Sequence, residues 1–241
     1  TWSFNFDGYG IRWYKELLGI CSENSGTTVC TDRWMVGIKN SALIAVFATF
    51  FASVLGTLAA LGLSNRHMPF NRLIMALMIS PMIVPLIITA AGMFFFFAKL
   101  NLVATIPGLI VAHTILGIPF VVITVTASLA GFDNNLLRAA ATLGGSPLRN
   151  FFKIQAPLIA PGVISGSLFA FITSFDEVVI VLFVGGTKYT LPRQMWSGIR
   201  NEISPTILAA ATILVIFSIL LLTTLEMLRR RSEKIRGVTP H

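Results

Sequence analysis

Charged residues are scarce in this sequence, and long stretches of it contain none. Only 12% of the 241 residues are charged and 55% are apolar, whereas a soluble globular domain has about 25% charged residues. This composition excludes an ordinary soluble protein. The net charge of +8 would suggest nucleic-acid binding only if the basic residues formed a soluble patch, so their positions matter more than their sum.

Histidine and cysteine are also rare, which excludes most metal and nucleophile chemistry. The three histidines, His67, His113 and His241, are isolated from one another, and no cluster of His, Cys, Asp and Glu has the spacing of a metal site. No glycine-rich phosphate-binding fingerprint is present. We therefore expect a chain that is not an enzyme and holds no metal or cofactor. His113 is interpreted as a polar side chain hydrogen-bonded across helices.

The two cysteines, Cys21 and Cys30, both precede the first long apolar stretch. In an oxidising exterior they would form a structural disulfide, and two free thiols are the alternative.

Five stretches lack Asp, Glu, Lys and Arg, and each is longer than the ~20 residues that a helix needs to cross the hydrocarbon core. Their apolar residues surround the helix instead of following one stripe, and lipid excludes open strands. The sequence thus predicts an all-α integral membrane protein with five transmembrane helices, bent where prolines occur. The stretches are residues 40–65, 73–98, 100–132, 154–175 and 203–225. The prolines are Pro81, Pro85, Pro107 and Pro119.

Basic residues in the loops predict the orientation. Segments 65–72, 131–160 and 226–241 share one side of the five helices and hold ten basic and three acidic residues. The positive-inside rule makes that side cytoplasmic, so the N-terminus is expected outside and the C-terminus inside.

This topology predicts three regions. They are a periplasmic segment (1–39), a transmembrane domain (40–228) that includes a cytoplasmic loop (131–160), and a basic cytoplasmic tail (229–241). A polar segment outside has to be carried across the membrane, and no signal peptide is visible. We therefore expect a sixth helix upstream of Thr1.

The loop 131–160 has the pattern of a helix, a glycine turn and a second helix. An asparagine-led helix is expected to end at Gly144-Gly145, and Ser146-Pro147 then provides an N-cap followed by proline at the first helical position. Leu148 and Phe151 start an apolar stripe beside basic residues, and Pro157 is expected to end the second helix. This elbow would dock a partner or rest on lipid headgroups.

The fourth stretch continues past an acidic pair, Asp176-Glu177, and a single helix of about 25 residues from Pro161 would contain both. A carboxylate at membrane depth costs about 2.5–3.5 kcal/mol, so it normally faces a partner or a watery path. Adjacent residues diverge by about 100° on a helix. One split therefore directs Asp176 into a substrate pathway and Glu177 towards a neighbouring helix or the outer boundary.

The functional interpretation of this pair is a site that attracts a cationic amine. Trp196 or Tyr189 in the following outer loop would assist through cation–π contact. The structural alternatives are an ion pair with a basic residue of a partner subunit, or a cap for a broken helix.

Two segments carry a family resemblance. Arg138-Ala-Ala-Ala-Thr-Leu-Gly144, followed by Ile154-Gln-Ala-Pro157, resembles the "EAA" loop of the membrane subunits of bacterial ATP-binding-cassette (ABC) importers, with Arg138 in place of the usual Glu and Ala156 in place of the usual Leu. The likeness extends over nearly the whole chain, including the segment around Asp176. Taken together, these features resemble the spermidine/putrescine (PotC-type) permease subunits.

The resemblance implies a type I ABC importer transmembrane domain in the bacterial inner membrane. The elbow would be the coupling helix that docks on a cytoplasmic ATPase subunit, present in two copies, which binds the ATP and Mg. Further implied partners are membrane lipid, a related but non-identical second permease and a periplasmic binding protein, for which segments 2–34 and 187–204 are the available surfaces; no nucleic acid is expected. The coupling residues would be Arg138, Ala139, Ala140, Gly144, Pro147, Leu148, Arg149 and Phe151.

The implied function is translocation of polyamines by alternating access. The alternatives are an ABC permease for another small solute (an opine, an amino acid or iron), an ion-coupled secondary transporter, and a membrane scaffold or channel subunit. A secondary transporter would normally show an internal repeat, and none is visible.

Overall fold

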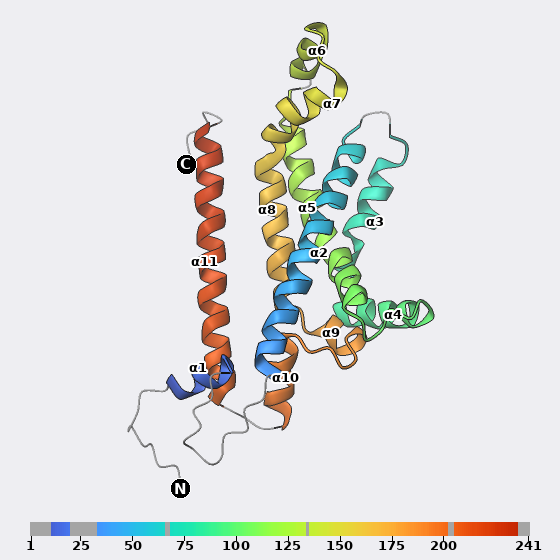
Figure 1. The fold of residues 1–241 in the computed structure, drawn as a ribbon. Helices are drawn as coiled ribbons and strands as arrows, with labels where there is room; N and C mark the ends of the chain where they lie inside the picture. Colours follow the sequence, from blue (N-terminus) through green and yellow to red (C-terminus); the bar gives the residue numbers. More distant parts are fainter. Residues whose placement is uncertain (1–10, 20–32, 66–67, 134, 202–204, 236–241) are drawn as a thin grey trace.

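The computed structural model describes residues 11–19, 33–65, 68–133, 135–201 and 205–235. Within these ranges all regular secondary structure is helical (Figure 1), which confirms the all-α prediction and is what a lipid environment requires of the backbone. Cys21 and Cys30, and with them the predicted disulfide, lie outside the described residues.

Three helices form the centre of the fold: α2 (Arg33–Leu63), α5 (Ile106–Ala130) and α8 (Ala156–Asp176). Small residues allow their backbones to approach closely. A Cβ atom on Gly117 of α5 would lie 3.0 Å from the Cβ atoms of both Ala52 and Ala170. The hydroxyls of Ser53 and Ser167, 2.6 Å apart, join α2 to α8. Residues far apart in sequence are thereby held in one tight bundle.

The second predicted span is broken. Residues 73–98 form two helices, α3 (Asn71–Ile83) and α4 (Leu86–Lys99), which meet at an angle of 104°. The residue before a proline avoids the helical region, and Val84, which precedes Pro85, is extended with ψ 134°. Pro85 therefore ends a helix instead of bending one.

Four helical stretches in the described residues are long and apolar enough to cross a membrane, and the bent pair makes a fifth when counted as one span. The prediction of five spans holds with this change. The four stretches are Arg33–Leu63, Ile106–Ala130, Pro147–Asp176 and Pro205–Thr224.

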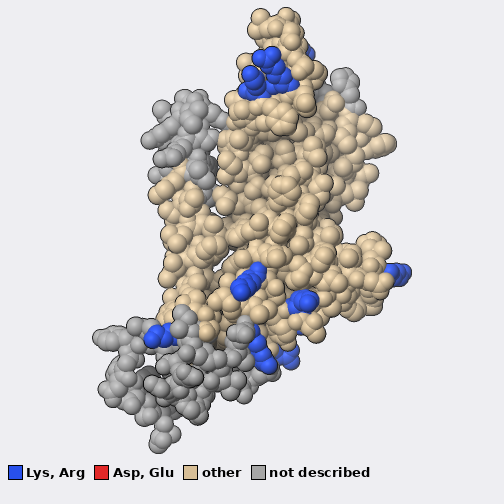
Figure 2. All heavy atoms as spheres, in the orientation of Figure 1, with Lys and Arg blue, Asp and Glu red and all other residues tan. Residues whose placement is uncertain are grey.

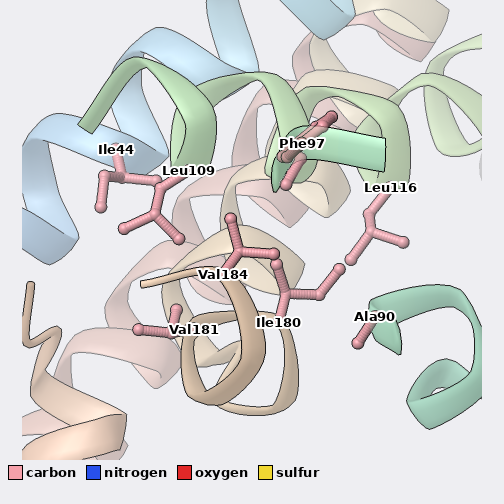
Figure 3. Packing of buried hydrophobic residues seen from close by; sticks show 9 residues of the cluster. Ile44, Ala90, Phe97, Leu109, Leu116, Ile180, Val181 and Val184 are labelled. Atoms are coloured by element: carbon pink, nitrogen blue, oxygen red, sulfur yellow. The ribbon is translucent and has the colours of Figure 1, made fainter. Parts of the chain in front are cut away.

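The single helix predicted through the acidic pair is wrong. Helix α8 ends at Asp176, Glu177 is extended with ψ 121°, and a short helix α9 (Val179–Val184) follows. Helix α9 packs against α4 and α5, and Figure 3 shows Ile180 and Val184 of α9 among apolar side chains of those helices. Helices α4 and α9, the second segments of the two broken spans, thus share one apolar cluster.

The segment 187–204, expected as a loop, contains helix α10 (Leu191–Asn201). Near it, α1 (Ile11–Leu17) and the start of the last helix, α11 (Pro205–Ile235), meet the start of α2. Leu17, Trp34 and Ile207 are buried together there. Beyond this contact α11 runs alongside α8 towards the other end of the molecule (Figure 1).

At the opposite end of the bundle the predicted elbow projects beyond the spans (Figure 1). It consists of α6 (Asn135–Thr142), α7 (Pro147–Asn150) and a π-helical turn (Phe151–Gln155) that leads directly into α8. The prediction that Pro157 ends this helix is therefore wrong. Pro157 lies in the first turn of α8, directly after the π-helical turn, where the backbone N–H of Ala156 donates to the carbonyl oxygen of Phe151 five positions back.

Basic residues gather at the two ends of the bundle. Figure 2 shows Lys and Arg atoms on the elbow and at the opposite end, with a band free of Lys, Arg, Asp and Glu between them on this face. That band is the part of the surface suited to the hydrocarbon core.

Candidate functional site

The acidic pair lies where α8 breaks, and its two carboxylates have different surroundings. Glu177 is buried, with 8% of its surface exposed, and its Oε1 accepts a hydrogen bond from the backbone N–H of Ile180 at 3.0 Å. It therefore caps α9, because the first N–H groups of a helix have no partner within the helix. Asp176 is exposed, and it is the member of the pair that can meet a solute.

Asp176 faces a cavity of about 380 Å³ between α8, α10 and α11. Among the described residues that line this cavity, Asp176 is the only charged one, and apart from Ser218 the remainder are apolar. A single carboxylate in an apolar wall attracts cations, but the wall has few polar groups to replace the water around a small ion. The cavity therefore suits an organic cation better than a small hydrated ion.

Aromatic rings form one side of this cavity. Phe175 of α8 stacks on Phe171, with ring centroids 5.7 Å apart, and its centroid lies 5.2 Å from that of Phe217 on α11. Phe175 and Phe217 line the cavity. Their faces carry the negative part of the ring quadrupole, which favours a cation or the polarised CH₂ groups beside one.

The two aromatic residues proposed to assist Asp176 lie elsewhere. Trp196 is on α10 but does not line the Asp176 cavity. Tyr189 lines a different cavity, of about 590 Å³, together with Arg33 and Lys188. The guanidinium of Arg193 lies 4.5 Å from the centre of the Tyr189 ring, so one face of that ring is already covered by a cation. The fold does not bring these rings to Asp176.

Arg193 was not identified from the sequence. Its Nη1 donates to the carbonyl oxygens of Val181, at 3.3 Å, and Lys188, at 3.0 Å. The Val181 carbonyl oxygen also accepts from the backbone N–H of Gly185, the C-cap of α9, at 3.0 Å. Arg193 therefore adds a second donor at the C-terminal end of α9, while Glu177 caps its start. No sequence signal pairs an arginine with a helix that begins so far upstream.

His113 is buried, with 1% of its surface exposed, on the central helix α5. Its Nδ1 lies 2.9 Å from Ser174 Oγ and 3.1 Å from the Ser174 carbonyl oxygen on α8. This confirms the interpretation of His113 as a hydrogen-bonded side chain between helices. The described residues contain no group of three His, Cys, Asp or Glu side chains that could hold a metal ion.

The elbow owes its shape to its glycines and to Asn150. Gly144 has φ +82°, a conformation that side chains other than glycine's rarely adopt, and a Cβ on Gly145 would lie 2.8 Å from the Ala140 carbonyl oxygen. The buried Asn150 donates from Nδ2 to the Gly145 carbonyl oxygen at 3.2 Å. Asn150 was missed from the sequence, because a polar residue in a loop gives no sign that it will be buried.

The predicted coupling residues line the outside of this elbow. Leu148 is 70% exposed, and its neighbour Leu143 is 88% exposed. Arg138, Ala139, Gly144, Pro147 and Arg149 are also exposed, whereas Ala140 and Phe151 are partly buried. Large apolar side chains held in water beyond the ends of the spans are typical of a surface that binds another protein.

A family model described as "Binding-protein-dependent transport system inner membrane component" matches residues 52–234. The spermidine/putrescine transport system permease protein PotC of Haemophilus influenzae is 30% identical, over 97% of this chain and 90% of that protein. PotC of Escherichia coli K12 is 31% identical (98% and 88%). The putrescine transport system permease protein PotI of the same strain is 34% identical (86% and 73%).

Solved structures share the fold at low sequence identity. The chain is similar to inward-facing conformations of the MetNI methionine ABC transporter, with a TM-score of 0.64, 18% identity, and coverage of 81% of this chain and 94% of the other. It is also similar to a chain of an amino acid ABC transporter solved with histidines, with a TM-score of 0.62, 16% identity, and coverage of 82% and 92%. These likenesses show the fold.

Proposed function

Since the chain belongs to the family of inner membrane components of binding-protein-dependent transport systems, we propose that it is the permease subunit of an ATP-driven importer of polyamines. The observation that carries the substrate class is the sequence identity of 30–34%, over most of the chain, to permeases named for spermidine and putrescine. The cavity beside Asp176 supports it, because its single carboxylate and apolar walls match an ammonium group attached to methylene groups.

Asp176 would act by neutralising an ammonium group on its way across the membrane. A cation in the hydrocarbon region has lost most of its hydration, and a carboxylate in the path lowers that cost. Phe175 and Phe217 would contact the methylene chain and exclude water from the ion pair. Alternating access then requires the α8–α11 cavity to open to each side in turn, as changes in subunit packing favour one state or the other.

The elbow would couple ATP hydrolysis by a partner subunit to transport. The tip of the elbow is an exposed surface formed by Leu143, Leu148 and the basic residues beside them. This surface is suited to a groove in a cytoplasmic ATPase subunit. Two such subunits would bind ATP and Mg, since no phosphate-binding loop occurs in this sequence. A second permease, related but not identical, and a periplasmic binding protein would complete the importer.

The orientation proposed for this assembly has the elbow and the C-terminus in the cytoplasm and the N-terminus outside. It rests on the ten basic and three acidic residues on the elbow side and on the positive-inside rule.

The proposed substrate site is tested by changing Asp176→Asn in the complete importer and measuring uptake of radiolabelled spermidine and putrescine. We expect the maximal rate to fall at least ~10-fold, because the amide cannot neutralise the ammonium group. The matched control is Glu177→Gln, which removes the adjacent charge but keeps an oxygen to cap α9. We expect that control to retain uptake within about twofold.

Equal amounts of assembled complex and equal basal ATPase rates would show that Asp176→Asn acts on translocation alone. Unchanged amine uptake in this variant would remove Asp176 from the pathway. Competition by unlabelled amino acids, opines or ferric iron, with none by amines, would instead identify a permease for another solute.

A further inference from the structure

We propose that His113 is a positioning residue, which holds the end of α8 against α5 so that Asp176 faces the cavity. The importance of this for transport rests on the function proposed for Asp176, but the geometry does not. His113 and Ser174 are 61 positions apart in sequence, and their contact is buried.

The break in α8 leaves the Ser174 carbonyl without its helical partner. In a continuous helix it would accept a hydrogen bond from the N–H of the residue four positions on. The chain instead becomes extended at Glu177, with ψ 121°, and helix ends leave their last carbonyls unpaired. Nδ1 of His113, 3.1 Å from this oxygen, is placed to supply the missing donor.

The chemistry of the two groups defines the proton position. A carbonyl oxygen can only accept, so the contact is a hydrogen bond when Nδ1 carries the ring proton. Nε2 is then an acceptor, and it has no hydrogen-bond partner among the described residues. An apolar side chain of similar size would avoid that unpaired atom. The imidazole therefore forms a hydrogen bond through Nδ1 and leaves Nε2 without one. The contact with Ser174 is thus the interaction that a histidine provides at this position and an apolar side chain does not.

Helical geometry links this contact to Asp176. Residues two positions apart on a helix point about 200° apart, so a turn that presses Ser174 towards α5 directs Asp176 to the opposite side. The burial agrees, because Ser174 is buried and Asp176 is exposed to the cavity beside α11. Turning or unwinding this last turn would move the carboxylate out of the cavity.

Other polar side chains on α5 do not make this connection. The hydroxyls of Thr114, Thr124 and Ser128 donate to carbonyl oxygens of α5 itself. His113 reaches across to α8 at the level of the break.

The test measures the accessibility of position 176 in the complete importer. Asp176→Cys is introduced with Cys21 and Cys30 changed to Ser, and the rate of labelling by a cationic methanethiosulfonate reagent is measured. Added changes at His113 then separate donor position from polarity. Asn carries an N–H near the place of Nδ1, Gln carries one near Nε2, and Leu carries none.

We expect His113→Leu and His113→Gln to slow labelling at least ~10-fold, because the conformation that exposes position 176 becomes a minor one. His113→Asn should stay within about threefold of the parent. Ser174→Ala, which removes Oγ but keeps the carbonyl oxygen, should do the same. The Gln variant keeps size and polarity, so it serves if the Leu variant fails to accumulate.

Labelling at the parent rate in the Leu or Gln variant would overturn the proposal, as would equal slowing by Asn and Gln. These outcomes do not depend on uptake. If Asp176→Asn leaves transport unchanged, the function proposed for Asp176 fails while the labelling pattern still decides the role of His113.

Discussion

At the scale of single residues, two adjacent carboxylates have separate roles because the backbone breaks between them. Asp176 is the last residue of α8 and opens into a cavity, whereas Glu177 turns inward and satisfies an N–H group of α9. A helix would place them about 100° apart, which separates their directions but does not reveal which one is buried. The cap for a broken helix, considered among the alternatives for the pair, describes Glu177.

This arrangement predicts that Glu177 matters for stability through its oxygen and not through its charge. Glu177→Ala should lower the free energy of unfolding by about 1–2 kcal/mol, because a buried N–H of α9 loses its acceptor. Glu177→Gln keeps an acceptor and should lower it by less than about half of that. Thermal unfolding of the purified complex in detergent measures both. Equal loss in the two variants would show that the negative charge is what matters.

At the scale of elements, the elbow is built from short-range rules and stabilised by one contact. Gly144 ends α6 in a left-handed conformation, Ser146 and Pro147 start α7, and Asn150 ties the two together through the Gly145 carbonyl oxygen. The π-helical turn passes from α7 into α8 without an intervening loop. A continuous helical backbone therefore joins the elbow to the end of α8 that carries Asp176.

The elbow therefore predicts the effect of the double change Gly144→Glu and Leu148→Glu. The first change places a side chain at φ +82°, and the second puts a charge on the exposed apolar surface of the elbow. Docking of the ATPase subunit and uptake should therefore both fall at least ~10-fold. Co-purification of the ATPase subunit and uptake of labelled spermidine are the measurements. Leu18→Glu, at an apolar position that is 47% exposed at the other end of the molecule, is the control for co-purification of the ATPase subunit and should leave it unchanged. Normal binding and uptake in the double variant would exclude the elbow as the docking site.

At the scale of the whole molecule, Lys and Arg lie at the two ends, and the band between them shows no Lys, Arg, Asp or Glu on the face drawn in Figure 2. The net charge of +8 is a sum over both ends, so it does not show where the basic residues lie. Basic residues at the ends are compatible with lipid headgroups, and their excess beside the elbow is the feature that predicts which end is cytoplasmic.

The predicted orientation is tested with single cysteines at the two ends, in a background in which Cys21 and Cys30 are changed to Ser. Thr187→Cys, in the exposed segment before α10, should react with an impermeant maleimide in intact cells. Phe70→Cys, 78% exposed between α2 and α3, should react only after the membrane is permeabilised, because that end is expected inside. The reverse pattern would contradict the topology derived from the basic residues.

The sequence by itself determined the features that depend on neighbours along the chain. Uncharged stretches longer than ~20 residues specify membrane spans, and glycine, serine and proline specify the turns of the elbow. The family, too, was recognisable from short motifs around Arg138 and Pro157. Each of these signals is local, because capping, helix propensity and partition into lipid act over a few residues or a single helix.

Only the tertiary structure decided the features that depend on residues distant in sequence. Pro85 turned an expected bend into a break of 104°, α9 found its place against α4 and α5, and Ser174 met His113. The sequence located the acidic pair, but the packing of α8 against α5 placed one carboxylate in a cavity and buried the other. Such choices arise from close packing between helices, in which each small residue fixes how near its neighbours can come.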